Sequence, residues 1–352
     1  MTESQAVPVR TVTGVIGSDE LGVTLTHEHL ANVWMQADGG VERDPLFPEL
    51  LEQKVSASNA WMLRDRPYSN YDNCVLDDDE GMLEELLAYK AVGGVSVMET
   101  TPDGEGRSPE RLRAMSEASG INVVMGGGWY LERFHPKGFA GLSVDGITNE
   151  LMQQYRPETA EAGILPGFIG EIGISPFFTE QEAKVLRAAG NVQLDQKIPI
   201  MVHLPGWKRY GEEVARILIK EVGVDPHAIV LAHMDPSGVD SDYQRRLAER
   251  GVWIEFDMIG MPFYYPSGVE GQSPSPADTA TAIKNLVDAG HGDQVLLSHD
   301  LFLKAMMTKH GGNGLCYVPT LFVDRLEREG VDPALAQRML RHAGRLFEAA
   351  AR

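Results

Sequence analysis

The stretch Val23-Thr24-Leu25-Thr26-His27-Glu28-His29 decides how this chain folds, because it has the pattern of a buried strand that ends in two histidines. Its apolar and β-branched residues favour an extended conformation. In an extended chain residues i and i+2 point to the same side, so His27 and His29 face one point while Glu28 faces away. Two converging imidazoles indicate a metal site, although a single His-x-His is equally compatible with one core histidine and one loop histidine.

Length and composition limit the possible folds and partners. The 352 residues are 43% hydrophobic and 23% charged, as in a soluble globular protein, and fit two ordinary domains or one large α/β barrel. Lys and Arg number 31 against 51 Asp and Glu, which gives a net charge of −20. This charge repels nucleic acid and acidic membrane surfaces, so we expect neither as a partner.

The cysteine content and the first residues bear on the cellular compartment. Cys74 and Cys316 are the only cysteines, too few for a disulfide framework or a thiolate zinc module. The chain does not begin with a signal-peptide pattern, and no apolar run approaches the length of a membrane span. We therefore expect a cytoplasmic protein.

Seven further strand-like runs follow the first one, separated by helix-compatible segments. They cover residues 95–99, 122–125, 167–171, 198–203, 228–233, 252–257 and 294–300. Strand-helix alternation repeated eight times is the pattern of a (β/α)8 barrel. A doubly wound sheet would need a glycine fingerprint after its first strand, and residues 27–40 have none. We predict an α/β protein with a single TIM barrel domain over residues 1–352.

Three segments extend the predicted barrel. Residues 8–25 suggest a short N-terminal hairpin, and residues 333–350 a C-terminal helix against the barrel. The stretch from residue 30 to about residue 79 has no long period but contains tryptophans and prolines. An insertion of this length is expected to pack over a site.

Residues that commonly bind metals stand at the ends of five predicted strands. They are His27 and His29 on the first strand, Glu171 on the fourth, His203 on the fifth, His233 on the sixth and Asp300 on the eighth. In such barrels the carboxyl ends of the strands share one face and build the active site. Imidazole and carboxylate ligands suit zinc, with manganese, cobalt or iron as alternatives.

Six ligands exceed what one catalytic zinc ion uses, and two ions explain them. We expect His27, His29 and Asp300 around a buried ion and His203 and His233 around an exposed one. Glu171 would bridge the two ions, and a hydroxide between them would attack the substrate.

The motifs along the chain resemble those of the phosphotriesterase-like family of the amidohydrolase superfamily. The resemblance rests on the ligand order and on residues 26–30, 99–102, 106–109, 128–130, 135–136, 170–173 and 298–300. It spans essentially the whole chain. It implies a barrel with paired divalent metals and hydrolytic activity, and a homodimer is a family expectation.

Two positions depart from the family pattern. Many members bridge their metals with a carbamylated lysine, whereas this chain has Glu171, as in the branch resembling the mammalian phosphotriesterase-related proteins. True phosphotriesterases carry a histidine after the strand-seven aspartate, and here Met258 follows Asp257. This difference weakens the case for phosphotriester hydrolysis.

Other residues are candidates for substrate contacts. Tyr130 follows a glycine run and could bind a substrate oxygen or the bridging hydroxide, or could be a packed loop residue. Lys208 and Arg209 could recognise an anionic group, or could be solvated loop residues. Asp257 is a further candidate, better suited to supporting a ligand than to binding metal. Asp235 could orient a ligand, move protons or cap a helix.

The remaining residues near this rim indicate the chemical character of the pocket. His299 precedes Asp300, so its side chain should point away from the metals. Residues 258–265 and 306–317 are apolar, glycine-containing loop segments. Because such loops line the pocket, we expect a small-molecule substrate with an apolar portion.

These residues predict a binuclear metal hydrolase that cleaves a carboxyl-derived bond, in a lactone, an ester or an N-acyl amide. Asp300 would accept a proton and return it to the leaving group. The alternatives are a phosphotriesterase and a ligand-binding protein that keeps the metal scaffold without turnover.

Overall fold

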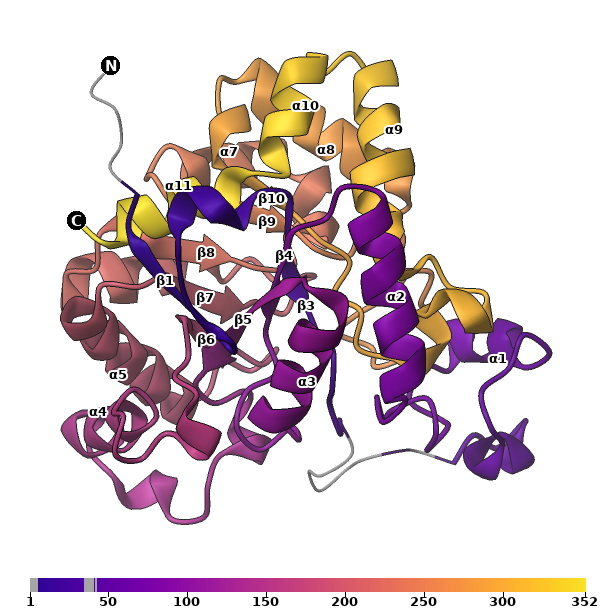
Figure 1. The fold of residues 1–352 in the computed structure, drawn as a ribbon, viewed down its shortest axis with the longest axis horizontal. Coiled ribbons are helices and arrows are strands. Elements are labelled where there is room, and N and C mark those ends of the chain that lie inside the picture. The colour runs from indigo at the N-terminus through magenta and orange to yellow at the C-terminus, as the bar shows by residue number, and fades with distance from the viewer. Residues whose placement is uncertain (1–5, 35–40, 42) are drawn as a thin grey trace.

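The computed structural model describes residues 6–34, 41 and 43–352, and eight of its strands form one parallel barrel (Figure 1). In chain order they are β3 (Thr24–Glu28), β4 (Ser96–Glu99), β5 (Asn122–Gly127), β6 (Phe168–Gly173), β7 (Ile200–His203), β8 (Ile229–Leu231), β9 (Trp253–Phe256) and β10 (Val295–Leu297). Each strand pairs with the next in parallel. The predicted TIM barrel is confirmed, and the observed strand limits lie close to the predicted ones.

The first and last strands meet just beyond their carboxyl ends. The Asp300 backbone N–H donates to the His27 carbonyl at 3.1 Å, and the His29 N–H donates to the Leu301 carbonyl at 3.1 Å. These two bonds close the barrel at this rim. They also bring the first and last predicted ligand segments, about 270 residues apart in sequence, into direct contact.

Helices follow most strands and cover the outside of the barrel (Figure 1). They are α1 (Ala60–Asp65), α2 (Asp79–Ala91), α3 (Pro109–Ser119), α4 (Val144–Gln153), α5 (Glu180–Gln196), α6 (Gly211–Ala215), α7 (Ser241–Ala248), α8 (Pro276–Asp288), α9 (Val323–Arg328), α10 (Pro333–Met339) and α11 (His342–Ala350). Capping boxes start two of them, at Thr179 for α5 and at Ser275 for α8. Among the described residues, no helix has the length and apolar character needed to cross a bilayer.

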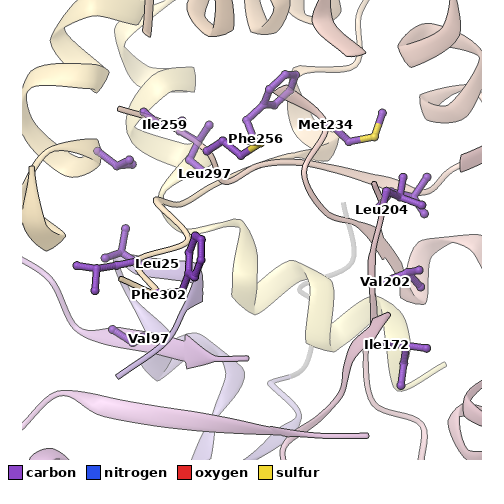
Figure 2. Packing of buried hydrophobic residues seen from close by; sticks show 14 of the residues in the cluster. Leu25, Val97, Ile172, Val202, Leu204, Met234, Phe256, Ile259, Leu297 and Phe302 are labelled. Carbon is purple, nitrogen blue, oxygen red and sulfur yellow. The ribbon is translucent and has the colours of Figure 1, made fainter. Parts of the chain in front are cut away.

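Alternate residues of the strands supply two hydrophobic layers. Met98, Phe168 and Leu296 belong to an inner cluster within the barrel. Val97, Val202 and their equivalents pack with helix residues in an outer cluster, part of which is drawn in Figure 2. Because both faces are buried, the strands have near-continuous apolar sequences, which is why the sequence pattern reveals them.

The two ends of the chain close the bottom of the barrel. The predicted hairpin is present as β1 (Pro8–Thr11) and β2 (Gly14–Gly17), and Val9 joins the inner cluster together with Leu346 and Phe347 of α11. The predicted C-terminal helical segment is present against the barrel, but over residues 333–350 it is divided into α10 and α11. At the break, the Leu340 carbonyl accepts a hydrogen bond from the backbone N–H of Thr24, the first residue of β3, at 2.8 Å.

The insertion after β3 packs over the carboxyl-end face of the barrel, as predicted for its described part. Trp34 stacks on Tyr68 with ring centroids 4.2 Å apart, and both line the main cavity. Residues 35–40 and 42 of this insertion lie outside the described residues.

Candidate metal centre

The structure brings all six predicted ligands together at the carboxyl ends of the strands. His27 lies in β3 with His29 just after it, Glu171 lies in β6, and His203 is the last residue of β7. His233 and Asp300 follow β8 and β10 within three residues. Parallel strands end at one rim, so residues far apart in sequence converge there.

Four of these side chains form a compact group. His27 Nε2 lies 3.5 Å from Glu171 Oε2 and 3.8 Å from Asp300 Oδ1. His29 Nε2 lies 3.4 Å from Asp300 Oδ1 and 3.7 Å from Glu171 Oε1. Ligand atoms that share one tetrahedral zinc ion stand about 3.4 Å apart. The spacing of this group therefore matches one shared cation.

The remaining two histidines lie near Glu171 Oε2, the oxygen that also faces His27. His203 Nδ1 lies 3.2 Å and His233 Nε2 3.5 Å from Glu171 Oε2. The two ring nitrogens are 2.7 Å apart, a hydrogen-bond distance shorter than the separation of two nitrogens on one ion. Glu171 is the side chain common to both groups.

A buried nitrogen atom of His27 without a hydrogen-bond partner indicates that this site suits a cation. Among the described residues, His27 Nε2 is buried without a hydrogen-bond partner, and it faces Glu171 and Asp300. A buried lone pair directed at carboxylates is unfavourable unless a proton or a metal ion lies between them. The donor set of imidazoles and carboxylates therefore fits a divalent metal.

Acceptors behind three histidines hold their rings in the orientation that metal binding needs. His29 Nδ1 is 2.8 Å from Thr101 Oγ1, and His233 Nδ1 is 2.8 Å from Asp257 Oδ1. His27 Nδ1 lies 3.3 Å from both Asp257 and Glu255. With Nδ1–H donating outward, each Nε2 faces the centre, and His29 Nε2 also lies 3.2 Å from the Thr100 hydroxyl.

The charges of the site shift its pKa values in opposite directions. Burial alone would raise the pKa of Glu171, but His27 and His203 hold it well below its usual value. Burial would lower the pKa of His27, yet the carboxylates of Asp257, Glu171 and Glu255 raise it to about 10. Without a metal, His27 therefore carries a proton that a cation must displace.

Two ligand residues have left-handed backbones. His233 has φ 55° and Asp300 has φ 50°. This conformation costs a residue other than glycine about 1 kcal/mol or more, and such strain is concentrated at functional sites. The turn lets each chain segment leave its strand while the side chain points into the barrel mouth.

The other predicted residues occupy distinct places. The Tyr130 hydroxyl lies 3.2 Å from both ring nitrogens of His203 and lines the cavity. Asp257 is fully buried and supports His27 and His233. Asp235 accepts the backbone N–H groups of residues 257 and 258, which anchors the end of β9. His299 contacts Glu28 at 2.7 Å, on the side away from the centre as predicted.

A cavity of about 680 Å³ lies over the six ligands, and five of them line it. Its apolar wall includes Tyr68, Trp207, Met258, Met261, Tyr265 and Phe302. These residues come from the insertion and from the loops after β7, β9 and β10. The arrangement can hold a small molecule of mixed polarity against a metal centre.

The cations of the cavity differ from those predicted. Neither Lys208 nor Arg209 is among the described residues that line it, and Arg209 instead faces Asp240 at 3.7 Å and the Tyr243 ring. Arg66 and Arg133 line the cavity, together with Glu105. No sequence pattern identifies these loop residues, because side chains in loops follow no regular period. Glu255 could have been predicted as a site residue from the sequence. It lies on β9 two residues before Asp257, so the two side chains point to the same side.

Comparison with known proteins identifies relatives over the whole chain. The model of the phosphotriesterase family matches residues 7–347. N-acetyltaurine hydrolase of Homo sapiens is 30% identical over 335 residues, which cover 94% of this chain and 95% of that protein. The N-acetyltaurine hydrolase of Tetraodon nigroviridis is 31% identical with the same coverage.

Solved structures agree with this relationship. A resiniferatoxin-binding protein from Rhodobacter sphaeroides is 41% identical with a TM-score of 0.92, covering 98% of this chain and 96% of that one. A lactonase from Listeria monocytogenes shares the fold at 22% identity with a TM-score of 0.77, covering 97% of this chain and 99% of that one. With six histidine and carboxylate side chains that could hold metal at one barrel rim and a family match along its length, the chain belongs to the phosphotriesterase family.

Proposed function

We propose that this hydrolase uses two divalent cations to cleave a carboxyl-derived bond. The observation that carries the proposal is the group of four imidazoles and two carboxylates on the floor of one cavity. His27, His29 and Asp300 would hold one ion, and His203 and His233 the other. Glu171 would join them, since its Oε1 faces His29 and its Oε2 faces His203 and His233. Zinc suits this thiolate-free set, as do manganese, cobalt and iron.

The side chains divide the chemical work among them. When bound, the ions supply Lewis acidity to the scissile carbonyl and acidify the attacking water. Asp300 accepts the proton of that water and returns it to the leaving group. The Tyr130 hydroxyl, beside His203, stands where it can donate a hydrogen bond to a substrate oxygen. Asp257 keeps His27 and His233 in place through both reaction steps.

The relatives favour an N-acyl amide among the carboxyl-derived bonds, because several of them are N-acetyltaurine hydrolases. The apolar wall would hold the acyl part of the substrate. Phosphotriester hydrolysis is less favoured, because Met258 lines the cavity at the position after Asp257 and has no proton to transfer.

A turnover screen of the metal-loaded protein tests the proposal. The substrates to be tested are lactones, aryl esters, N-acyl amino acids, N-acetyltaurine and phosphotriesters. We expect the highest kcat/KM within the carboxyl-derived group. Turnover of phosphotriesters alone would contradict the proposal. So would tight binding of these compounds without turnover of any, which would identify a binding protein.

A further inference from the structure

Three loops meet beside the metal centre and form a polar wall of the cavity. They follow β3, β4 and β5 at residues 31–34, 102–106 and 130–134. The Val33 backbone N–H donates to the Glu105 carbonyl at 2.7 Å. Gly104 has φ 97°, and a Cβ there would stand 2.9 Å from the Phe134 carbonyl oxygen. These contacts hold Glu105 and the 130–134 loop in a fixed relation.

Arg133 presents an unpaired guanidinium at this wall. Its Cζ lies 4.8 Å from the Trp34 ring centroid and 5.0 Å from that of Phe134. Among the described residues it has no carboxylate within ion-pair distance and makes no side-chain hydrogen bond, and it lines the cavity. Stacking on aromatic rings orients the planar fork and leaves its N–H groups free for an anion.

The other arginine that lines the cavity, Arg66, already has hydrogen-bond partners within the protein. Arg66 Nε donates to Asp44 Oδ2 at 2.6 Å, and its Nη1 donates to a backbone carbonyl. On a chain with a net charge of −20, a lone guanidinium at the cavity wall is therefore a distinct local attraction for a negative group.

Glu105 lies on the same wall with an unused acceptor. The residue is 2% exposed, and its Oε1 has no hydrogen-bond partner among the described residues. Burial raises the pKa of Glu105, the charge of Glu171 raises it further, and the charge of Arg133 opposes both. Glu105 is therefore within electrostatic reach of both the metal centre and Arg133. A buried acceptor of this kind is unfavourable until a ligand donates to it.

We propose that Arg133 and Glu105 form a recognition subsite for the amine half of an N-acyl amide. Arg133 binds an anionic end group, a carboxylate or a sulfonate, and Glu105 accepts the N–H of the scissile amide. The inference rests on the proposed hydrolysis of carboxyl-derived bonds and names the substrate class within it. Lactones have neither group, so they would leave both side chains unpaired, and such unpaired polar groups select strongly against a substrate.

Removing the guanidinium tests the anion contact. The probes are N-acetyl-β-alanine, N-acetyltaurine and the neutral primary amide of N-acetyl-β-alanine. Arg133→Gln should raise KM for the anionic probes about tenfold or more, because a charge-assisted hydrogen bond is lost, while KM for the neutral amide stays within about twofold. The matched control is Lys137→Gln, which removes the same charge from an exposed residue outside the cavity lining. A rise confined to one anionic probe identifies that anion as the ligand, whereas an equal rise for the neutral amide overturns the anion contact.

Glu105→Leu tests the N–H contact with a pair of isosteres. N-acetyl-β-alanine has the N–H, and its ester analogue 3-acetoxypropanoate has an oxygen at that position. We expect kcat/KM for the amide to fall about tenfold and that for the ester to change little, with Glu105→Gln restoring most of the loss. Equal losses for both compounds would overturn the role of Glu105.

Binding measured by calorimetry separates this inference from the proposed function. If the parent turns over none of the lactones, esters and N-acyl compounds of the screen, the proposed function fails, but the Kd values of the probes still decide the subsite. Tighter binding of N-acetyl-β-alanine than of its neutral amide, lost in Arg133→Gln, supports the subsite. Equal Kd values for the two compounds in the parent overturn it.

Discussion

Asp300 has two proposed roles at the centre, as a metal ligand and as the proton acceptor. Its carboxylate lies 3.4 Å from His29 Nε2, and its left-handed backbone is one that asparagine adopts readily. We therefore expect Asp300→Asn to fold like the parent while kcat falls by about 10² or more, since an amide cannot accept the proton. Circular dichroism, metal analysis and steady-state kinetics check this. A variant with parental metal content and parental kcat would rule out Asp300 as the base.

Glu171 lies between both groups of histidines and is the proposed bridge, so its negative charge should decide whether two cations can bind close together. Glu171→Gln keeps the size but removes the negative charge, and we expect metal affinity and kcat/KM to fall together. Because a carboxylate needs no carbon dioxide to become anionic, the parent should keep its activity after thorough carbon dioxide removal. Full metal content and parental kcat/KM in Glu171→Gln would show that the carboxylate does not bridge.

At the scale of elements, α11 ties the end of the chain to the bottom of the barrel. His342, at its start, is 1% exposed, and its Nδ1–H donates to the Val295 carbonyl of β10 at 2.8 Å. Burial lowers the pKa of His342 to about 4. The folded state thus keeps the ring neutral at pH values where the unfolded chain, with a pKa of 6.5, already binds a proton.

This difference makes stability depend on pH with a defined sign. The stability contributed by keeping His342 neutral is complete above pH 6.5. It is lost as the pH falls to about 4, which lowers the free energy of unfolding by roughly 1–3 kcal/mol. Between pH 6.5 and about 4, the free energy of unfolding measured with urea should fall less for His342→Gln than for the parent. The exposed His227 offers the control, as His227→Gln should follow the parent. Identical pH slopes for the parent and His342→Gln would contradict the buried neutral ring.

The elements also show why the sequence predicts some features and not others. The buried strands and their terminal ligands follow from side-chain period, so β3 and its histidines could be placed in advance. The break before α11 could not, because it depends on a bond between Leu340 and Thr24 that joins distant segments. Arg133 and Glu105 lie in loops, where the direction of a side chain depends on local turns and packing. For the same reason Arg209 points to Asp240 and not into the cavity.

At the scale of the whole molecule, the barrel places six candidate metal ligands, drawn from segments between residues 27 and 300, around one point. Cations that bind only the folded state should stabilise it by mass action. Removing metal with a chelator should therefore lower the midpoint of thermal unfolding, and zinc or manganese should restore it. A midpoint unchanged by chelation, in a protein shown to have lost its metal, would mean that the ions do not couple to folding.

The proposed binuclear centre is tested most directly by counting the metal ions bound per chain. The measurement is elemental analysis of the protein after reconstitution with excess zinc or manganese and removal of free metal, with Glu171→Gln prepared in parallel. We predict about two ions per chain in the parent and a clear deficit in the variant. A parent that holds no more than one ion per chain would contradict the two-metal assignment.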